Sequence, residues 1–161
     1  MTAQPRGMLD RDTLAALVEA GEIGTVLVAF PDMYGRLLGK RYDAGYFLEA
    51  ADRGLHFCDY LLACDMEMNP VPGYQFTGWD RGYKDAWGDI DWSTLRRASW
   101  LDRSALVLCD IRSEASGAPV EIVPRSVLRH QIERASAAGL RAKGACELEF
   151  FVFSDSYETA R

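Results

Sequence analysis

Two glutamates, Glu147 and Glu149, alternate with apolar residues in the segment 146–153 (CELEFFVF) near the end of this chain. Side chains of a β-strand point to opposite faces in turn, so both glutamates share one face, with Cα atoms roughly 7 Å apart. Apolar residues occupy both faces of the segment, which is typical of a strand inside a covered sheet. Two buried carboxylates are unfavourable unless a positive charge compensates them, and Mg²⁺ or Mn²⁺ does so directly. The alternative is a strand end whose glutamates reach solvent or pair with Arg or Lys.

The size and charge of the chain limit its function class. Its 161 residues and 48% hydrophobic content fit a globular protein with one good core, or one domain and a piece of another. A formal net charge of -6 argues against a nucleic-acid partner, whose binding surface would be basic. No apolar run is long enough to span a membrane and the first residues carry no apolar signal core, so we expect no membrane partner.

Cysteine and histidine usage points to a reducing, cytoplasmic setting. The four cysteines show no Cys-x-x-Cys spacing, and nothing in their pattern demands disulfides. Cys109 and Cys146 lie in predicted strands, where we expect them to be small buried apolar residues. Only His56 and His130 could supply imidazole ligands, so we expect no zinc site and interpret both as surface or packing residues.

Local signals predict a chain of short helices and strands. Asp10 or Asp12 can cap a first helix, and Asp43 can cap a second, shorter one. Pro124 suits the first turn of a third helix, and Gly139 suits its C-terminal end. Runs of β-branched and apolar residues predict strands, with turn residues at 31–35 between the first two. The predicted strands span residues 25–30, 37–42, 55–58, 104–110 and 140–153.

Residues 65–91 form the least regular stretch, with glycines and prolines among aromatic side chains. A loop this long is usually functional or disordered, and its aromatic content argues against disorder. Two interpretations stay open: an Ω-like loop packed on its own aromatics, or a flap that contacts a substrate or a neighbouring subunit. A stacking platform for single-stranded nucleic acid would conflict with the acidic net charge.

A small polar connector at residues 114–119 marks the predicted domain boundary. Residues 1–113 would form a small mixed α/β unit that begins with a hairpin. Residues 114–161 would then be only the opening elements of a second domain.

Four segments resemble the glutamine synthetase superfamily, in the family's order and over nearly the whole chain. Residues 144–153 resemble its Glu-x-Glu-Phe-Phe metal strand, and residues 121–128 resemble the Pro-Arg-Ser start of the first helix of its catalytic domain. Residues 26–40 are similar to the first hairpin of its N-terminal domain, and residues 85–100 to the stretch that follows. An unrelated α/β domain with a structural Glu-x-Glu would have to match all four segments by accident.

The resemblance implies an α+β fold, with a β-grasp-like N-terminal domain followed by the first helix and strand of a glutamine synthetase-type catalytic domain. It implies a ligase that joins glutamate to ammonia or a larger amine, with ATP as co-substrate and γ-glutamyl phosphate as intermediate. Mg²⁺ or Mn²⁺ would neutralise the phosphates, with Glu147 binding the metal associated with ATP and Glu149 the metal nearer glutamate. Family members form stacked rings in which one subunit's N-terminal domain completes its neighbour's active site, so we expect a homo-oligomeric ring.

One departure from the family pattern concerns the amine. Members that use ammonia usually carry Phe-Asp-Gly-Ser-Ser after the second helix, and the Asp helps to bind and deprotonate ammonium. Here the matching stretch is residues 57–62 (FCDYLL), without Gly-Ser-Ser, and Asp59 or Asp65 could take the place of that Asp. The chain is therefore more similar to the branch that ligates larger amines, such as polyamines or ethanolamine.

A second departure is the end of the chain at Arg161, before most of the family's catalytic domain. We therefore expect a fragment without ligase activity of its own, in which the apolar strand around residues 150–153 has lost its sheet neighbours. The alternative function is a non-catalytic β-grasp unit that acts as an interaction module or as an inactive subunit.

Overall fold

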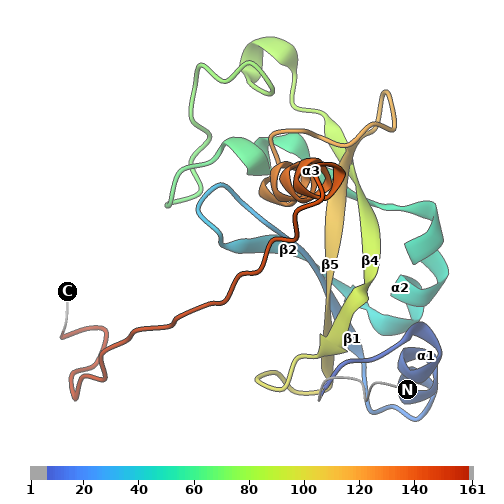
Figure 1. Cartoon of the computed structure of the whole chain (residues 1–161). Helices are drawn as coiled ribbons and strands as arrows, with labels where there is room; N and C mark the ends of the chain where they lie inside the picture. The colour runs from blue at the N-terminus through green and yellow to red at the C-terminus, as the bar shows by residue number, and fades with distance from the viewer. Residues whose placement is uncertain (1–6, 160–161) are drawn as a thin grey trace. The chain divides into compact units, whose positions relative to one another are not determined.

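A five-stranded mixed sheet organises the structure, a computed structural model that describes residues 7–159 (Figure 1). The strand order is β2-β1-β5-β4-β3. Strand β1 runs parallel to β5 and antiparallel to β2, while β4 runs antiparallel to both β5 and β3. The strands are β1 (Thr25–Pro31), β2 (Leu37–Asp43), β3 (Leu55–Cys58), β4 (Asp85–Arg97) and β5 (Ser104–Ser113).

Three α-helices and three short 3-10 helices accompany the sheet within residues 7–159. Aspartates cap the first two α-helices as predicted: the Asp10 carboxylate accepts from the Thr13 backbone N–H at 2.7 Å, and Asp43 from Tyr46 at 3.0 Å. None of the helices in the described part of the chain has the length and apolarity needed to cross a membrane. The helices are α1 (Arg11–Glu19), α2 (Ala44–Ala50), α3 (Pro124–Ala137), η1 (Ala51–Arg53), η2 (Asp59–Ala63) and η3 (Trp79–Arg81).

The main core lies between α1, α2 and one face of the sheet. Leu14 of α1 and Phe47 of α2 are fully buried in the same cluster as Val28 of β1 and Val107 of β5. Burial of apolar surface on this face is the largest favourable contribution to folding. The result agrees with the predicted α+β class.

Strand β4 corrects the prediction of an irregular loop over residues 65–91. At its start the small buried residues Ala86 and Gly88 alternate with the less buried Asp85, Trp87 and Asp89, so the strand lacks the apolar run by which strands were recognised. Gly88 must be small because a Cβ there would lie 2.6 Å from Cε2 of Phe57. The irregular connection between η2 and β4 therefore ends at Lys84.

The contacts divide the chain into two units, with the division between His130 and Gln131. The predicted domain boundary between residues 113 and 114 stays a prediction. Helix α3 ends before Gly139, which has the positive φ of +74° expected at a helix C-terminus.

The predicted strand over residues 140–153 is wrong, because none of these residues is in a strand. Cys146 is exposed rather than buried, whereas Cys109 is buried as expected. Five apolar side chains are 74–87% exposed: Leu148, Phe150, Phe151, Val152 and Phe153. The physical reason is that a strand is stable only when a neighbour satisfies its backbone hydrogen bonds, and no other described strand pairs with this segment.

Candidate functional site

The predicted metal ligands Glu147 and Glu149 are both exposed in this irregular segment. Among residues 7–159, neither belongs to a group of three or more potential metal ligands. Their carboxylates have the donor chemistry that Mg²⁺ and Mn²⁺ prefer, but two side chains do not fill the six oxygen positions of such an ion. The pair therefore fits part of a divalent-metal site by chemistry, and the described residues do not complete it.

Asp59, the first alternative for the ammonium-binding residue, is buried at the start of η2. Its Oδ1 accepts hydrogen bonds from the Thr77 hydroxyl at 2.7 Å and from the Lys84 backbone N–H at 3.2 Å. Its own backbone N–H donates to the Lys84 carbonyl at 2.8 Å. Asp59 thus joins the start of η2 to the later part of the connection between η2 and β4, and its carboxylate is engaged in those contacts.

Asp65, the second alternative, shapes a turn within the same connection. Its Oδ1 accepts from the backbone N–H groups of Glu67 and Asn69, each at 2.9 Å. The hydrogen bond from the Asn69 backbone is the main cause that lowers the pKa of this carboxyl. Both candidate aspartates therefore have structural partners in this chain.

An ion pair that no predicted motif included links this connection to the β1–β2 turn. Arg36 Nε donates to the buried Asp32 carboxylate at 2.7 Å, while its Nη1 and Nη2 donate to the carbonyls of Met66 at 2.7 Å and Asp65 at 2.9 Å. Burial alone would raise the pKa of Asp32, but hydrogen bonds from Arg36 and Tyr34 outweigh it and lower the pKa. The spacing of an Asp and an Arg four residues apart across a turn was the available signal.

A second network surrounds Arg125, which the sequence analysis noted only within the Pro-Arg-Ser segment. Arg125, in the first turn of α3, pairs with Asp91 of β4 and donates from Nε to Asp110 of β5 at 2.8 Å. Arg129, one turn later, also donates to Asp110. Burial raises the pKa of Asp91, but hydrogen bonds from Ser93 and Arg125 outweigh it, so the pKa is lowered. These contacts fix the start of α3 to the sheet.

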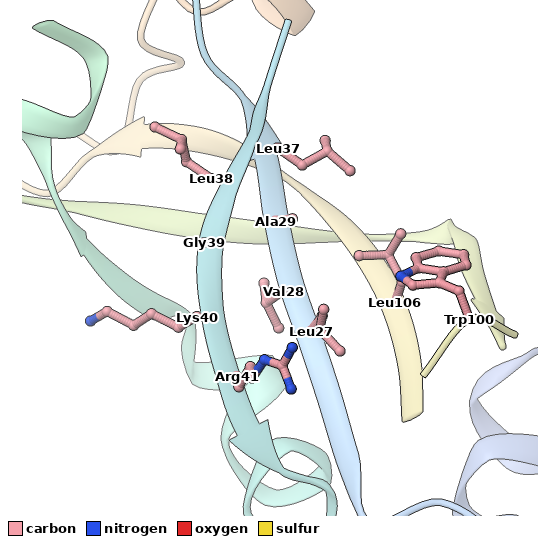
Figure 2. A pocket seen from close by; sticks show the side chains of 10 residues that line it. All are labelled: Leu27, Val28, Ala29, Leu37, Leu38, Gly39, Lys40, Arg41, Trp100 and Leu106. Carbon is pink, nitrogen blue, oxygen red and sulfur yellow. The ribbon is translucent and has the colours of Figure 1, made fainter. Parts of the chain in front are cut away.

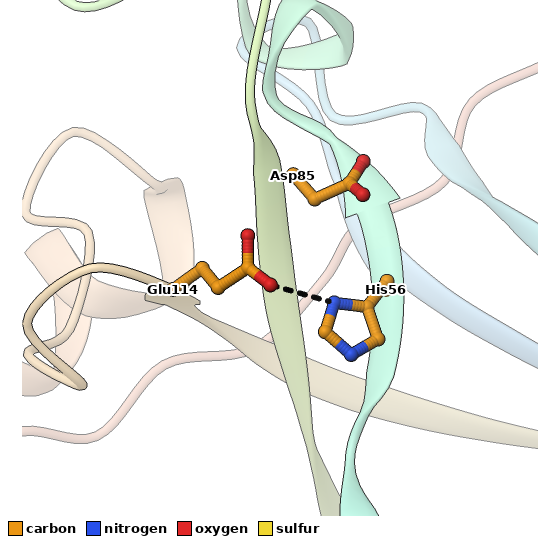
Figure 3. A group of neighbouring side chains, drawn as sticks. All are labelled: His56, Asp85 and Glu114. Carbon is orange, nitrogen blue, oxygen red and sulfur yellow. Dashed lines mark ion pairs between the residues drawn. The ribbon is translucent and has the colours of Figure 1, made fainter.

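His56, Asp85 and Glu114 form a group of potential metal ligands that the sequence analysis did not foresee (Figure 3). One ligand atom from each lies within 4.8 Å of the others, and all three side chains are exposed. No local motif announces the group, because His56 belongs to β3, Asp85 begins β4 and Glu114 follows β5.

An apolar groove of about 310 Å³ lies over the β1–β2 hairpin (Figure 2). Leu27, Leu37, Leu106 and Trp100 lie on the same side of the hairpin. Trp100 and Leu37 are largely exposed there, so the described residues leave this part of the sheet face uncovered. The groove lacks the convergent polar groups of a small-molecule site, because Lys40, although in its lining, points to the other side of the hairpin and donates to the His56 carbonyl, which leaves Arg41 as the charged side chain on the groove side.

No protein-family model matches this chain. The chain is 49% identical over 150 residues to a gamma-glutamylethanolamide synthetase of Streptomyces coelicolor, an alignment that covers 92% of this chain and 32% of the relative. It is 38% identical over 140 residues to a glutamate–isopropylamine ligase of a Pseudomonas species, covering 86% and 30%. A type-1 glutamine synthetase of Dictyostelium discoideum is 30% identical over 131 residues, covering 81% and 25%.

Two solved structures of GmaS, an ADP complex and an apo form, share the fold. Each gives a TM-score of 0.59 at 22% identity and covers 78% of this chain and 26% of the solved chain. The chain thus spans about a third or less of the length of the relatives that it matches.

Proposed function

We propose that this chain is the N-terminal part of an ATP-dependent glutamate–amine ligase. The chain is homologous to ligases of the glutamine synthetase superfamily and to their amine-ligase branch. The observation that carries the proposal is the 49% identity to a gamma-glutamylethanolamide synthetase across 92% of the chain. ATP would phosphorylate the γ-carboxylate of glutamate, and the amine would displace phosphate from the resulting γ-glutamyl phosphate. This chemistry depends mainly on positioning and on charge stabilisation.

Glu147 and Glu149 are the residues of this chain that would hold a divalent ion. Mg²⁺ or Mn²⁺, when bound, would neutralise phosphate oxygens and hold reacting groups in place. The two exposed carboxylates would supply part of its oxygen shell, and other ligands would come from elsewhere in a longer protein. The apolar residues beside them would then gain the sheet neighbours that their exposure lacks.

The amine would be a small primary amine larger than ammonia. Residues 57–62 lack the Gly-Ser-Ser that accompanies ammonia use in the family. Asp59 is buried and engaged by Thr77 and Lys84, so it is not presented to an ammonium ion in this structure. Two relatives carry the names of an ethanolamide synthetase and of an isopropylamine ligase, which supports the same substrate class.

The proposal includes a homo-oligomeric ring in the cytoplasm, in which the connection between η2 and β4 lies near a subunit junction. Trp79 in this connection is 86% exposed, as a residue that contacts a neighbouring subunit would be in an isolated chain. The alternative, an interaction module or inactive subunit, is favoured by a different observation. The first unit has its own fully buried core, whereas the described residues do not complete the predicted metal site of Glu147 and Glu149.

The test is amine-dependent release of phosphate from ATP and glutamate, measured on the product of the whole reading frame and on this 161-residue chain alone. We expect the whole product to prefer ethanolamine, isopropylamine or putrescine over ammonia, and this chain alone to release no phosphate. Glu147→Gln and Glu149→Gln should each lower kcat at least about 100-fold, or about 2.7 kcal/mol. The matched control Glu158→Gln changes an exposed glutamate nearby and should retain activity.

Three results would contradict parts of the proposal. Full activity without both glutamates would remove the metal assignment. Preference for ammonia would remove the larger amine. An inactive whole product that nevertheless joins active rings would favour the inactive-subunit alternative.

A further inference from the structure

One end of the sheet brings three polar side chains from neighbouring strands to one place. In the antiparallel ladder His56 lies opposite Trp87, and Ala86 lies opposite Ser113. Residues directly opposite each other share a face, and so do residues two apart on one strand. The register therefore puts His56, Asp85 and Glu114 on a common face, and Figure 3 shows their side chains converging there.

The distances between the donor atoms approach those of a bound transition ion. All three lie within 4.8 Å of one another, and His56 Nδ1 is 3.7 Å from a Glu114 carboxylate oxygen. Ligand atoms in a tetrahedral zinc site, with bonds of about 2.0–2.1 Å, lie roughly 3.3 Å apart. Because the three side chains are exposed, small rotations about their side-chain torsions suffice to close the difference.

The charges of the group also point to a cation. Two carboxylates lie close together here, and in the described part of the chain neither Asp85 nor Glu114 accepts a hydrogen bond from a lysine or arginine. The cations bonded nearby are engaged elsewhere: Arg112 donates to Asp89 at 2.8 Å and to the Gly117 carbonyl at 3.2 Å, and Lys40 donates to the His56 carbonyl at 2.7 Å. A divalent ion would neutralise the two carboxylates and use the imidazole nitrogen between them.

We propose that His56, Asp85 and Glu114 bind a divalent transition ion of the Zn²⁺ class, with water in the remaining position. An imidazole nitrogen beside two carboxylates favours Zn²⁺ or Co²⁺ over Mg²⁺, which prefers oxygen ligands alone. The site departs from the sequence-based expectation that this chain has no zinc site and that His56 is a surface or packing residue. It would join β3, an edge strand of four residues, to β4 and to the end of β5.

The experiment titrates Zn²⁺ alone into this chain by calorimetry and uses Co²⁺ absorption to report the ligand type. A Cys146→Ser background removes the exposed thiol as a competing ligand. We expect one equivalent to bind, with the dissociation constant raised more than tenfold by His56→Ala or Asp85→Asn, which is about 1.4 kcal/mol or more. The matched control His130→Ala removes the other, also exposed, histidine and should leave binding unchanged. Zn²⁺ should also raise Tm in the background chain but not in His56→Ala.

Binding that is unchanged in His56→Ala and Asp85→Asn would overturn the site, as would no saturable binding by a chain with native circular dichroism. A thiolate charge-transfer band with Co²⁺ would assign the ion to cysteine instead and also overturn it. The inference stands apart from the proposed ligase function, because Zn²⁺ binding here should persist in Glu147→Gln/Glu149→Gln. Loss of ligase activity in that double variant would not affect the His56 site.

Discussion

Replacing Arg125 by alanine should destabilise the first unit by about 2–3 kcal/mol, because Asp91 and Asp110 of the sheet both lose the arginine that they share. Arg125 is 20% exposed, and Asp91 and Asp110 are 23% and 17% exposed. A hydrogen bond to a charged group contributes about 1.5–3 kcal/mol when shielded from water and no more than about 1 kcal/mol when exposed. The partial burial of this network lies between those cases, so we assign about 1–1.5 kcal/mol to each of the two contacts.

The assay is urea denaturation followed by tryptophan fluorescence and by circular dichroism, with the slope m compared between variants. The matched control is Arg129→Ala, which removes a side chain that is 52% exposed and that, among the described residues, pairs with Asp110 alone. We expect a loss of about 0.5 kcal/mol for this control. A double-mutant cycle with Asp91→Asn isolates the Arg125–Asp91 pair and should give a coupling free energy of about 1 kcal/mol.

The loss should also depend on pH. The folded state lowers the pKa of Asp91, since the hydrogen bonds from Ser93 and Arg125 outweigh the effect of burial. A carboxyl with a lowered folded pKa contributes stability above its unfolded pKa of about 3.9, and this stability is lost as pH falls through the folded pKa. The difference between wild type and Arg125→Ala should therefore be largest near neutral pH and should shrink in acid.

A loss below about 0.5 kcal/mol for Arg125→Ala at neutral pH would refute the reasoning, because that value is typical of a solvated surface pair. A difference that stays constant down to pH 2 would refute the electrostatic part alone. In that case lost packing of the arginine stem would be the cause.

Two further predictions concern a buried contact and a pair of thiols. Gly54→Ala should lower the free energy of unfolding by more than about 2 kcal/mol, because φ is +79° and a Cβ would lie 1.7 Å from Nε1 of Trp87. The control Gly73→Ala has φ +90° but open space around it, so it should lose about 1–2 kcal/mol in the same denaturation assay. Burial raises the pKa of the Cys109 thiol to about 12, so iodoacetamide at pH 8 should label exposed Cys146 within minutes and leave Cys109 unlabelled until the protein unfolds. Equal labelling of both thiols in mass spectra of the native chain would contradict the packing of β5.

Helices and hairpins whose sequence signals lie within a few residues of the element itself can be predicted from the sequence. Asp10 and Asp43 sit next to the helices that they cap, so the carboxylate and the backbone N–H groups it satisfies are already neighbours along the chain. The hairpin over β1 and β2 follows in the same way, because a short turn brings two complementary strands together. The resemblance to the glutamine synthetase superfamily also came from local segments in the correct order, and the relatives confirm it.

The missed and mistaken elements depend on partners far along the chain. Strand β4 has an unremarkable local pattern, and its pairing with β5 and β3 makes it a strand. The segment containing Glu147 and Glu149 shows the opposite case, because a strongly strand-like pattern stays irregular where no described strand pairs with it. The metal role of these two glutamates stays a prediction from the sequence.

The sequence by itself determined the capped helices, the β1–β2 hairpin, the relatives and the residue types available for chemistry. The tertiary structure decided which of these residues meet: Arg125 reaches Asp91 across 34 positions, and His56 meets Asp85 and Glu114 through the ladder of three strands. The physical reason is that charge pairing and metal ligation act over a few ångströms in space and not along the chain. Only a folded sheet with a fixed register can set those distances.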